Sequence, residues 1–174
     1  PHIGDELAFD LLDGRHIECA VTDINDNAIR FDSVDCLGDD MTYGKVEKWL
    51  DRIDHLLPDE LQRAIIDTER KHVINGKKID RLERLFLPAA SELFSGDNVL
   101  GDKGLYKQID WYKDRRHRMR MDEHNGNSTA YWTSSQHSGY STYFCYVNYY
   151  GDADYTGASA TWLSAPVCFR IRKS

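Results

Sequence analysis

The first third of the chain alternates apolar and polar residues with the period of two that is typical of half-buried β-strands. Three such runs have apolar members at Leu7, Phe9, Leu11, Ile17, Cys19, Val21, Ile29 and Phe31. Asp13-Gly14 separates the first two runs and Asn25-Asp26-Asn27 the last two, and both segments favour tight turns. We therefore predict a three-stranded antiparallel β-meander at the N-terminal end.

From about residue 42 the apolar period becomes that of a helix. The apolar positions are Val46, Trp49, Leu50, Ile53, Leu56 and Leu57. Pro58 fits the first position of a second helix, because a proline there removes no helical hydrogen bond. Leu61, Ile65 and Ile66 extend this second helix. The pattern predicts two short helices packed on the meander.

The middle of the chain predicts shorter elements. Asn75-Gly76 between apolar flanks indicates a β-hairpin. Residues 85–88 (Leu-Phe-Leu-Pro) predict a short buried strand, and residues 89–94 a brief helix. The polar and apolar pattern of residues 105–119 predicts a further helix.

Four short strands are expected at the C-terminal end. They are placed at about residues 131–134, 142–148, 158–163 and 166–172. Gly139, Gly151 and Gly157 favour turns between the first three. The chain is thus predicted to be α+β, with an N-terminal antiparallel β-meander, two or three helices and C-terminal short antiparallel strands.

Tyrosine is concentrated in the C-terminal segment, where seven of the ten tyrosines lie between Tyr131 and Tyr155. Tyrosine offers rigid contact area, while Ser, Gly and Asn offer adaptable hydrogen bonds, as in antibody binding loops. We predict a ligand-binding face here, to which Trp162 belongs as an anchor unless it is part of the core. The predicted binding residues are His137, Tyr140, Tyr143, Tyr146, Asn148, Tyr149, Tyr150, Asp152, Asp154 and Tyr155.

The strand at residues 142–148 decides how this face is displayed. We predict that Tyr143, Tyr146 and Asn148 are exposed, and that Phe144 and Val147 point inward. The alternative is that the tyrosines complete the core of the sheet.

The 174-residue chain has a net charge of −7 at pH 7, which disfavours binding to phosphate backbones. A basic run is the local exception, with Lys113, Arg115, Arg116, His117, Arg118 and Arg120. It could contact nucleic acid or an anionic glycan, but we interpret it as a solvated helix end. No apolar run approaches the roughly 18 residues of a membrane span. We predict no nucleic-acid partner and no membrane insertion.

Four cysteines occur without CxxC spacing, which disfavours zinc ribbons and redox pairs. Cys145 and Cys168 lie in strand-like segments and could be neighbours, although we favour buried free thiols. Their disulfide state stays open at this point.

Two groups of residues carry the oxygen ligands that calcium prefers. Asp97 and Asp102 lie in a glycine-rich loop without EF-hand spacing, which we interpret as solvated. Asn148, Asp152 and Asp154 lie together, but calcium takes six to eight oxygens and three polar residues usually form only a turn. We predict no metal and no cofactor.

Both ends of the C-terminal segment resemble a known family. Residues 131–135 (Tyr-Trp-Thr-Ser-Ser) and 167–172 (Val-Cys-Phe-Arg-Ile-Arg) are similar to the strands that open and close this segment in bacterial and phage proteins of the C-type-lectin-like fold. The resemblance implies this fold for residues 1–174 as a single domain. Residues 1–130 would be the scaffold, and residues 131–174 the ligand-binding strands and the closing strand.

Two activities of that fold are disfavoured. Calcium-dependent lectins use a Glu-Pro-Asn or Gln-Pro-Asp loop with a Trp-Asn-Asp triplet, and the chain has neither. Formylglycine-generating enzymes use a close cysteine pair, whereas Cys145 and Cys168 are 23 residues apart in sequence without the accompanying Ser-x-x-Tyr-Arg signature.

The chain also resembles the variable proteins of diversity-generating retroelements. In these, mutation of adenines in Asn codons yields Tyr, Ser, Asp, His or Gly but never Lys, Glu, Gln, Met or Trp, and residues 137–154 contain none of the excluded types. The resemblance implies a receptor- or adhesin-like protein, on a virion or cell surface, whose varied face binds a protein or surface glycoconjugate. The alternative is a structural or assembly module of a phage tail or cell surface.

Catalytic motifs are missing from the sequence. There is no G-x-S-x-G elbow, P-loop, HExxH or dinucleotide glycine motif. His72, His117 and His137 are scattered among polar residues, and nothing orders a Glu123–His124 dyad. We predict that the chain is not an enzyme.

Overall fold

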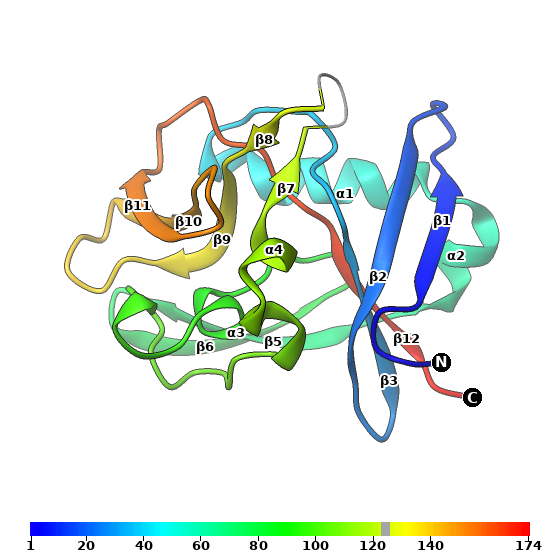
Figure 1. The fold of residues 1–174 in the computed structure, drawn as a ribbon, viewed down its shortest axis with the longest axis horizontal. Helices are drawn as coiled ribbons and strands as arrows, with labels where there is room; N and C mark the ends of the chain where they lie inside the picture. Colours follow the sequence, from blue (N-terminus) through cyan, green and yellow to red (C-terminus); the bar gives the residue numbers. More distant parts are fainter. Residues whose placement is uncertain (123–125) are drawn as a thin grey trace.

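A computed structural model describes residues 1–122 and 126–174 and has an α+β fold with mostly antiparallel strands (Figure 1). Strands β1 (Glu6–Asp10), β2 (His16–Ile24) and β3 (Ala28–Ser33) form the predicted antiparallel meander. The closing strand β12 (Cys168–Arg172) pairs with β3, and the short β4 (Ile65–Ile66) pairs with β12. These five strands form one sheet in the order β1-β2-β3-β12-β4, so the first and last strands lie in the same sheet.

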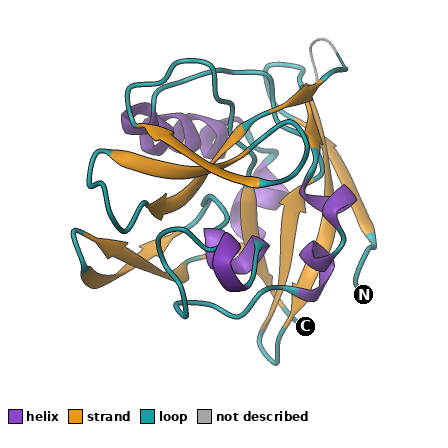
Figure 2. Ribbon diagram, turned by 60° about the vertical axis from the view of Figure 1, so that its left-hand side comes forward, coloured by secondary structure: helices purple, strands orange, loops and turns teal. Residues whose placement is uncertain are grey.

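A second, three-stranded sheet lies at the other end of the molecule (Figure 2). It consists of β9 (Tyr131–Gln136), β10 (Tyr143–Val147) and β11 (Ala153–Gly157), with β10 in the middle. The predicted strand at residues 158–163 is wrong, because the strand that pairs with β10 ends at Gly157. The chain then turns, with the N–H of residue 160 donating to the carbonyl of Gly157.

Two small antiparallel ribbons complete the strands. Strands β5 (Thr68–Ile74) and β6 (Lys77–Glu83) form the hairpin predicted from Asn75-Gly76, both of which have positive φ, 51° and 79°. Strands β7 (Arg120–Met121) and β8 (Ser128–Thr129) form the second ribbon.

The predicted helix pair is present in shortened form. Helix α1 (Val46–Leu56) follows a 3-10 turn, η1 (Tyr43–Lys45), and α2 (Asp59–Ala64) follows Pro58. The second helix stops before Ile65 and Ile66, because these two residues pair with β12. In the described part of the chain, no helix is both long and apolar enough to cross a membrane.

The remaining helices are single turns. The predicted brief helix is α3 (Ala90–Leu93), followed by η2 (Gly96–Asn98). The predicted helix at residues 105–119 is wrong, since only η3 (Asp110–Lys113) and α4 (Arg115–Arg118) form there. The Asp114 side chain accepts the N–H of Arg116, at 3.0 Å, and so caps a new helix where a continuous one would have run on.

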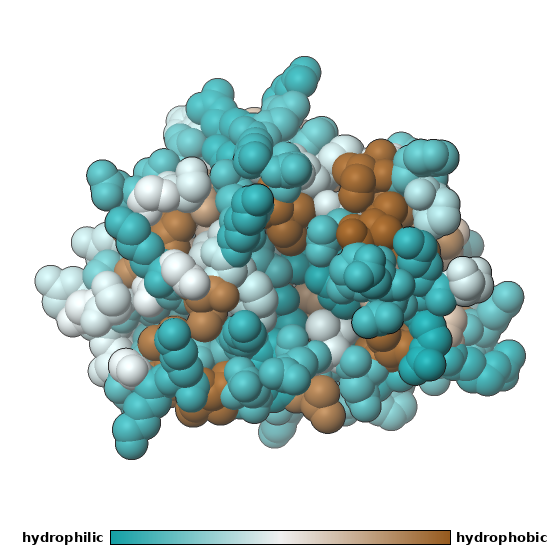
Figure 3. All heavy atoms as spheres, turned by 90° about the horizontal axis from the view of Figure 1, so that it is seen from below, coloured by the Kyte–Doolittle hydropathy of each residue, from teal (hydrophilic) through white to brown (hydrophobic). Residues whose placement is uncertain are grey.

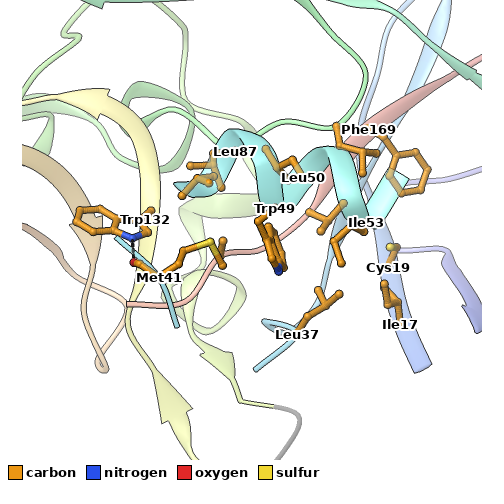
Figure 4. Packing of buried hydrophobic residues seen from close by; sticks show 14 of the residues in the cluster. Ile17, Cys19, Leu37, Met41, Trp49, Leu50, Ile53, Leu87, Trp132 and Phe169 are labelled. Carbon is orange, nitrogen blue, oxygen red and sulfur yellow. Dashed lines mark hydrogen bonds between the residues drawn. The ribbon is translucent and has the colours of Figure 1, made fainter. Parts of the chain in front are cut away.

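The larger apolar core joins the two sheets across α1 (Figure 4). It includes Ile17 of β2, Trp49 of α1, Trp132 of β9 and Phe169 of β12. The Trp132 indole Nε1 donates to the Met41 carbonyl at 2.9 Å, so the polar atom of this buried ring is paired. This hydrogen bond and the burial of the ring hold β9 against the core.

Charged side chains are buried where β3, β5 and α3 meet. The Glu92 carboxylate accepts hydrogen bonds from Arg30 and from Arg70, the latter at 2.6 and 3.0 Å, and Arg30 pairs with Asp32 at 2.8 Å. Burial alone would raise the pKa of Glu92, but the two guanidinium groups outweigh burial and hold that pKa well below its usual range. We call these four residues, together with Arg120, the buried charge network.

Arg120 extends the network to the second sheet. Its guanidinium donates to the hydroxyls of Tyr112, at 2.8 Å, and Tyr131, at 2.6 Å, while Tyr112 donates to Asp32. Arg120 is 1% exposed, so the prediction that the whole basic run is solvated is wrong for this residue, whereas Arg116 is exposed. The basic run thus supplies a structural cation.

Candidate ligand-binding face

Four partly exposed rings gather at one end of the β9–β11 sheet. We call His137, Tyr140, Tyr143 and Tyr155 the ring platform. The ring centroid of His137 lies 4.4 Å from that of Tyr155, and those of Tyr140 and Tyr143 lie 5.5 Å apart. The three tyrosines are 39–57% exposed. The platform therefore presents a contiguous aromatic surface to solvent.

Strand pairing explains how these rings meet. Tyr155 is directly opposite Cys145 on the neighbouring strand, so it lies on the same face of the sheet as Tyr143. The inner part of that face is covered by the loop that contains Gly101, where an added Cβ would lie 1.9 Å from the Gln136 carbonyl oxygen. Glycine is required at 101 because the loop approaches β9 so closely. The loop buries Cys145 and leaves the platform open.

The segment between β9 and β10 is held in place by hydrogen bonds. The Nδ1 atom of His137 lies 3.0 Å from the N–H of Gly139, which donates to it. Gln136 bridges this segment to the β5–β6 hairpin, donating to the Ser141 carbonyl at 2.5 Å and accepting from the N–H of Asn75 at 2.7 Å. The platform rings therefore stand on an ordered support.

Tyr146 does not belong to this face, so the prediction that it is exposed is wrong. It is 8% exposed, lies in the larger core, and packs edge-to-face on Trp162 with centroids 5.2 Å apart. Strand alternation places it on the side opposite Tyr143 and on the same side as Phe144, which stacks on Tyr43. Burial, and then the nearby Asp154 carboxylate, raise the pKa of Tyr146 to about 12. Trp162 is 43% exposed, but on this opposite side.

The turn after β10 exposes two more tyrosines. The Asn148 side-chain oxygen accepts the N–H groups of Tyr150 and Asp152, each at 3.0 Å, so Asn148 shapes the turn. Tyr149 and Tyr150 are both exposed. Gly151 is buried with a φ of 79°, and an added Cβ would lie 2.9 Å from Met119 Cγ.

The acidic residues of the two candidate calcium groups have other roles. Asp154 is half-buried and accepts the N–H of Tyr155 at 2.8 Å, while Asp152 is exposed. Asp102 is buried and accepts from both the N–H and hydroxyl of Ser91, so the solvated-loop prediction holds for Asp97 but is wrong for Asp102. Within residues 1–122 and 126–174, no three His, Cys, Asp or Glu side chains are grouped to hold a metal ion.

The structure also shows the surroundings of the cysteines and of His72. Cys145 and Cys168 are buried and do not pair in a disulfide, and burial raises the pKa of Cys145 to about 12. His72 pairs with Glu83 at 2.7 Å, away from the platform. The proposed Glu123–His124 dyad lies outside the described residues.

Charged residues are scarce in the segment that carries the platform, a feature of the sequence that no motif marks. Between residues 128 and 169 the only Asp, Glu, Lys or Arg residues are Asp152 and Asp154, whereas 29% of the whole chain is charged. Seen from below, pale residues of near-neutral hydropathy gather toward the left end, where β9–β11 lie (Figure 3). The segment that carries the candidate face is therefore aromatic and polar but nearly uncharged.

Comparison with known proteins gives a family. No curated protein and no solved structure matches the chain. A model of the family DUF6273, described as a domain of unknown function, matches residues 41–173, which include α1, all three strands of the second sheet and the closing strand. This match covers more than half of the 174 residues, and the chain therefore belongs to the DUF6273 family.

Proposed function

We propose that this chain is a ligand-binding protein whose binding surface is the ring platform, extended by Tyr149 and Tyr150. The main observation in support of this proposal is that three exposed tyrosines and one histidine contact one another through their rings on an ordered sheet. A protein or a surface glycoconjugate is the ligand that such a face suits, because tyrosine dominates binding hot spots and tolerates both apolar and hydroxylated partners.

The support of the platform favours tight binding. Side chains that become ordered only on association cost about 0.5–1.5 kcal/mol each. Here the rings already pack on one another, and Gln136 and Gly139 hold the segment beneath them. The loss of conformational entropy on binding is correspondingly small.

We extend the proposal to the fold, as a C-type-lectin-like domain. Two observations support it: the second sheet begins at the Tyr-Trp-Thr-Ser-Ser segment, and the closing strand returns to the N-terminal meander beside β3. The two chain ends lie near each other at the right of Figure 1, as this proposal requires.

We further propose that the face is diversified by a retroelement. We expect the variable positions to be those whose side chains are exposed and outside the buried core. These are Tyr140, Tyr143, Tyr149, Tyr150 and Tyr155. Gly151 is fixed by its positive φ and by its close approach to Arg115 and Met119, and Tyr146 by the core. Deep sequencing of the gene in a population of source cells tests this: adenine-confined substitutions at the exposed codons, with a template repeat and a reverse transcriptase nearby, are expected. A uniform gene without a repeat would refute it.

Replacing Tyr140, Tyr143 or Tyr155 by alanine is expected to weaken binding of a ligand isolated with the wild-type chain. Loss of a central aromatic anchor costs about 2 kcal/mol or more, which corresponds to a Kd raised about 30-fold. Surface plasmon resonance measures the change. Leu12→Ala is the control, because Leu12 is also an exposed apolar side chain, at 67% against 39–57% for the three tyrosines, but lies in the β1–β2 turn. Equal affinities for all four variants would disprove the assignment of the face.

The alternative function, a structural or assembly module, makes a different prediction for the same residues. The molecular mass of the protein in solution distinguishes a binding protein from an assembly module. A monomer favours reversible recognition, whereas an obligate oligomer that Tyr143→Ala dissociates would identify the platform as a permanent subunit interface.

A further inference from the structure

A small pocket of about 70 Å³ lies beside the buried charge network. Its buried lining includes Thr22 of β2, Asp32 of β3, Tyr112 of η3 and Arg120 of β7. A water molecule takes up about 30 Å³ in the liquid. The pocket therefore has room for one small ion or for about two water molecules.

The buried charge network beside this pocket has a surplus of positive charge. It contains three guanidinium groups and two carboxylates, those of Arg30, Arg70, Arg120, Asp32 and Glu92. The buried Asp102 carboxyl group hydrogen-bonds to Ser91 instead, and burial raises its pKa. One positive charge of the network is thus left without a carboxylate, and a buried charge without a counter-charge is strongly unfavourable.

The surplus lies at Arg120, which hydrogen-bonds only to neutral oxygens in the described part of the chain. Its Nε donates to the Ser33 carbonyl at 3.1 Å, and its two terminal nitrogens donate to the hydroxyls of Tyr112 and Tyr131. Burial raises the pKa of both tyrosines, so neither supplies a negative charge at neutral pH. A guanidinium group has five N–H donors, and these bonds use three. Arg120 therefore keeps both a positive charge and two donors for a further acceptor.

Thr22 offers another donor to the same pocket. It lies between Val21 and Asp23, where the register of β2 on β3 shifts, so it is the extra residue of a β-bulge, a feature that redirects side chains. Thr22 is 2% exposed, and its hydroxyl oxygen is buried without a hydrogen-bond partner among the described residues. An unpaired buried hydroxyl is costly, and an acceptor in the pocket that Thr22 lines removes that cost.

Two stacked rings complete the lining and limit its size. Trp111 and His117 both line the pocket, and their ring centroids lie 3.6 Å apart. The Nδ1 atom of His117 is also hydrogen-bonded to the Trp111 carbonyl, at 2.7 Å. Because both rings are held in place, the pocket suits a ligand of small and fixed size.

We propose that this pocket binds one small inorganic anion, of the size of chloride, which accepts hydrogen bonds from Arg120 and Thr22 and balances the surplus charge of the network. Asp32 also lines the pocket, but both of its oxygens accept from Arg30, at 2.8 and 3.2 Å, and its charge is thereby balanced. The site is separate from the ring platform, and the inference does not depend on the proposed function.

The test uses the full chain, with chloride as the probe. Thermal unfolding is compared in sodium chloride and in sodium gluconate at the same ionic strength, so that general screening of charges is equal. The unfolding midpoint is expected to rise progressively with chloride concentration, because a ligand that binds only the folded chain stabilises it. Folded protein is also expected to broaden the chlorine NMR line of the salt, as bound and free chloride exchange.

Thr22→Val removes the hydroxyl but keeps the shape of the side chain. The Kd for chloride, taken from the line width as a function of chloride concentration, is expected to rise about tenfold or more, as for the loss of one hydrogen bond to a charged group. Thr68→Val is the matched control, because Thr68 of β5 also has a buried hydroxyl oxygen without a partner in the described part of the chain, but does not line this pocket.

Two results would overturn the proposal. Equal stability of the wild-type chain in the two salts, or a chlorine line that the protein does not broaden, would mean that water alone fills the pocket. A Kd for chloride that is the same in Thr22→Val and Thr68→Val would mean that chloride binds elsewhere on the molecule.

Discussion

Replacing Glu92 by glutamine is expected to lower the free energy of unfolding by about 3–5 kcal/mol, the usual cost of removing one partner from a buried ion pair. The carboxylate is 3% exposed and is the shared acceptor for Arg30 and Arg70. Without its charge, two buried guanidinium groups lose their common counter-ion. Urea unfolding followed by circular dichroism measures the loss.

The same carboxylate makes stability depend on pH. Because the Glu92 pKa is depressed in the folded chain, its contribution is complete above the unfolded-state pKa of about 4.3 and is lost as the pH falls toward the folded value. The wild-type chain should therefore lose stability below about pH 4, and Glu92→Gln should lose less over that interval. Parallel pH profiles for the two proteins would contradict this account of Glu92.

Tyr146→Ala is expected to destabilise the chain by about 3 kcal/mol or more, as large-to-small changes of buried aromatic residues do. Tyr146 lies in the core against Trp162. Tyr143→Ala, only three positions earlier on the same strand, is expected to cost less than about 1 kcal/mol, because Tyr143 is partly exposed and lies among the platform rings. Thermal and urea unfolding of the pair measure the difference.

The comparison of these two tyrosines tests the division of the strand into two faces. Tyr146→Phe controls for the hydroxyl and should retain most of the stability, since the ring is kept. Equal destabilisation by Tyr143→Ala and Tyr146→Ala would mean that the platform is part of the core, as the alternative interpretation of the tyrosines holds.

Local signals in the sequence predict the local structure well. The Asn75-Gly76 hairpin and the N-terminal meander are confirmed, because turn residues and a period of two act within a few positions. Helix α1 is confirmed because its helical apolar period is also a local signal. The helix expected at residues 105–119 fails because Asp114 interrupts it with a cap, and caps compete with periodic patterns over one turn.

Features that depend on distant contacts are not predictable in this way. Arg30 and Glu92 are 62 residues apart in sequence, so no pattern near either one indicates that they pair. The prediction that Tyr146 is exposed is wrong because both sides of β10 are covered here, one by the core under α1 and the other by the Gly101 loop. The tyrosine-rich composition indicates a binding face, but only the register of β10 and β11 shows which rings meet.

The exposed positions of the face have a consequence for how this domain can evolve. Tyr140 and Tyr150 contribute no side chain to either buried cluster, while Gly151 and Tyr146 beside them are fixed by contact. Under the proposed function, substitutions at the exposed positions change recognition while the free energy of unfolding stays nearly constant. A binding protein built in this way can then acquire new specificities without the compensating mutations that altered protein cores usually require.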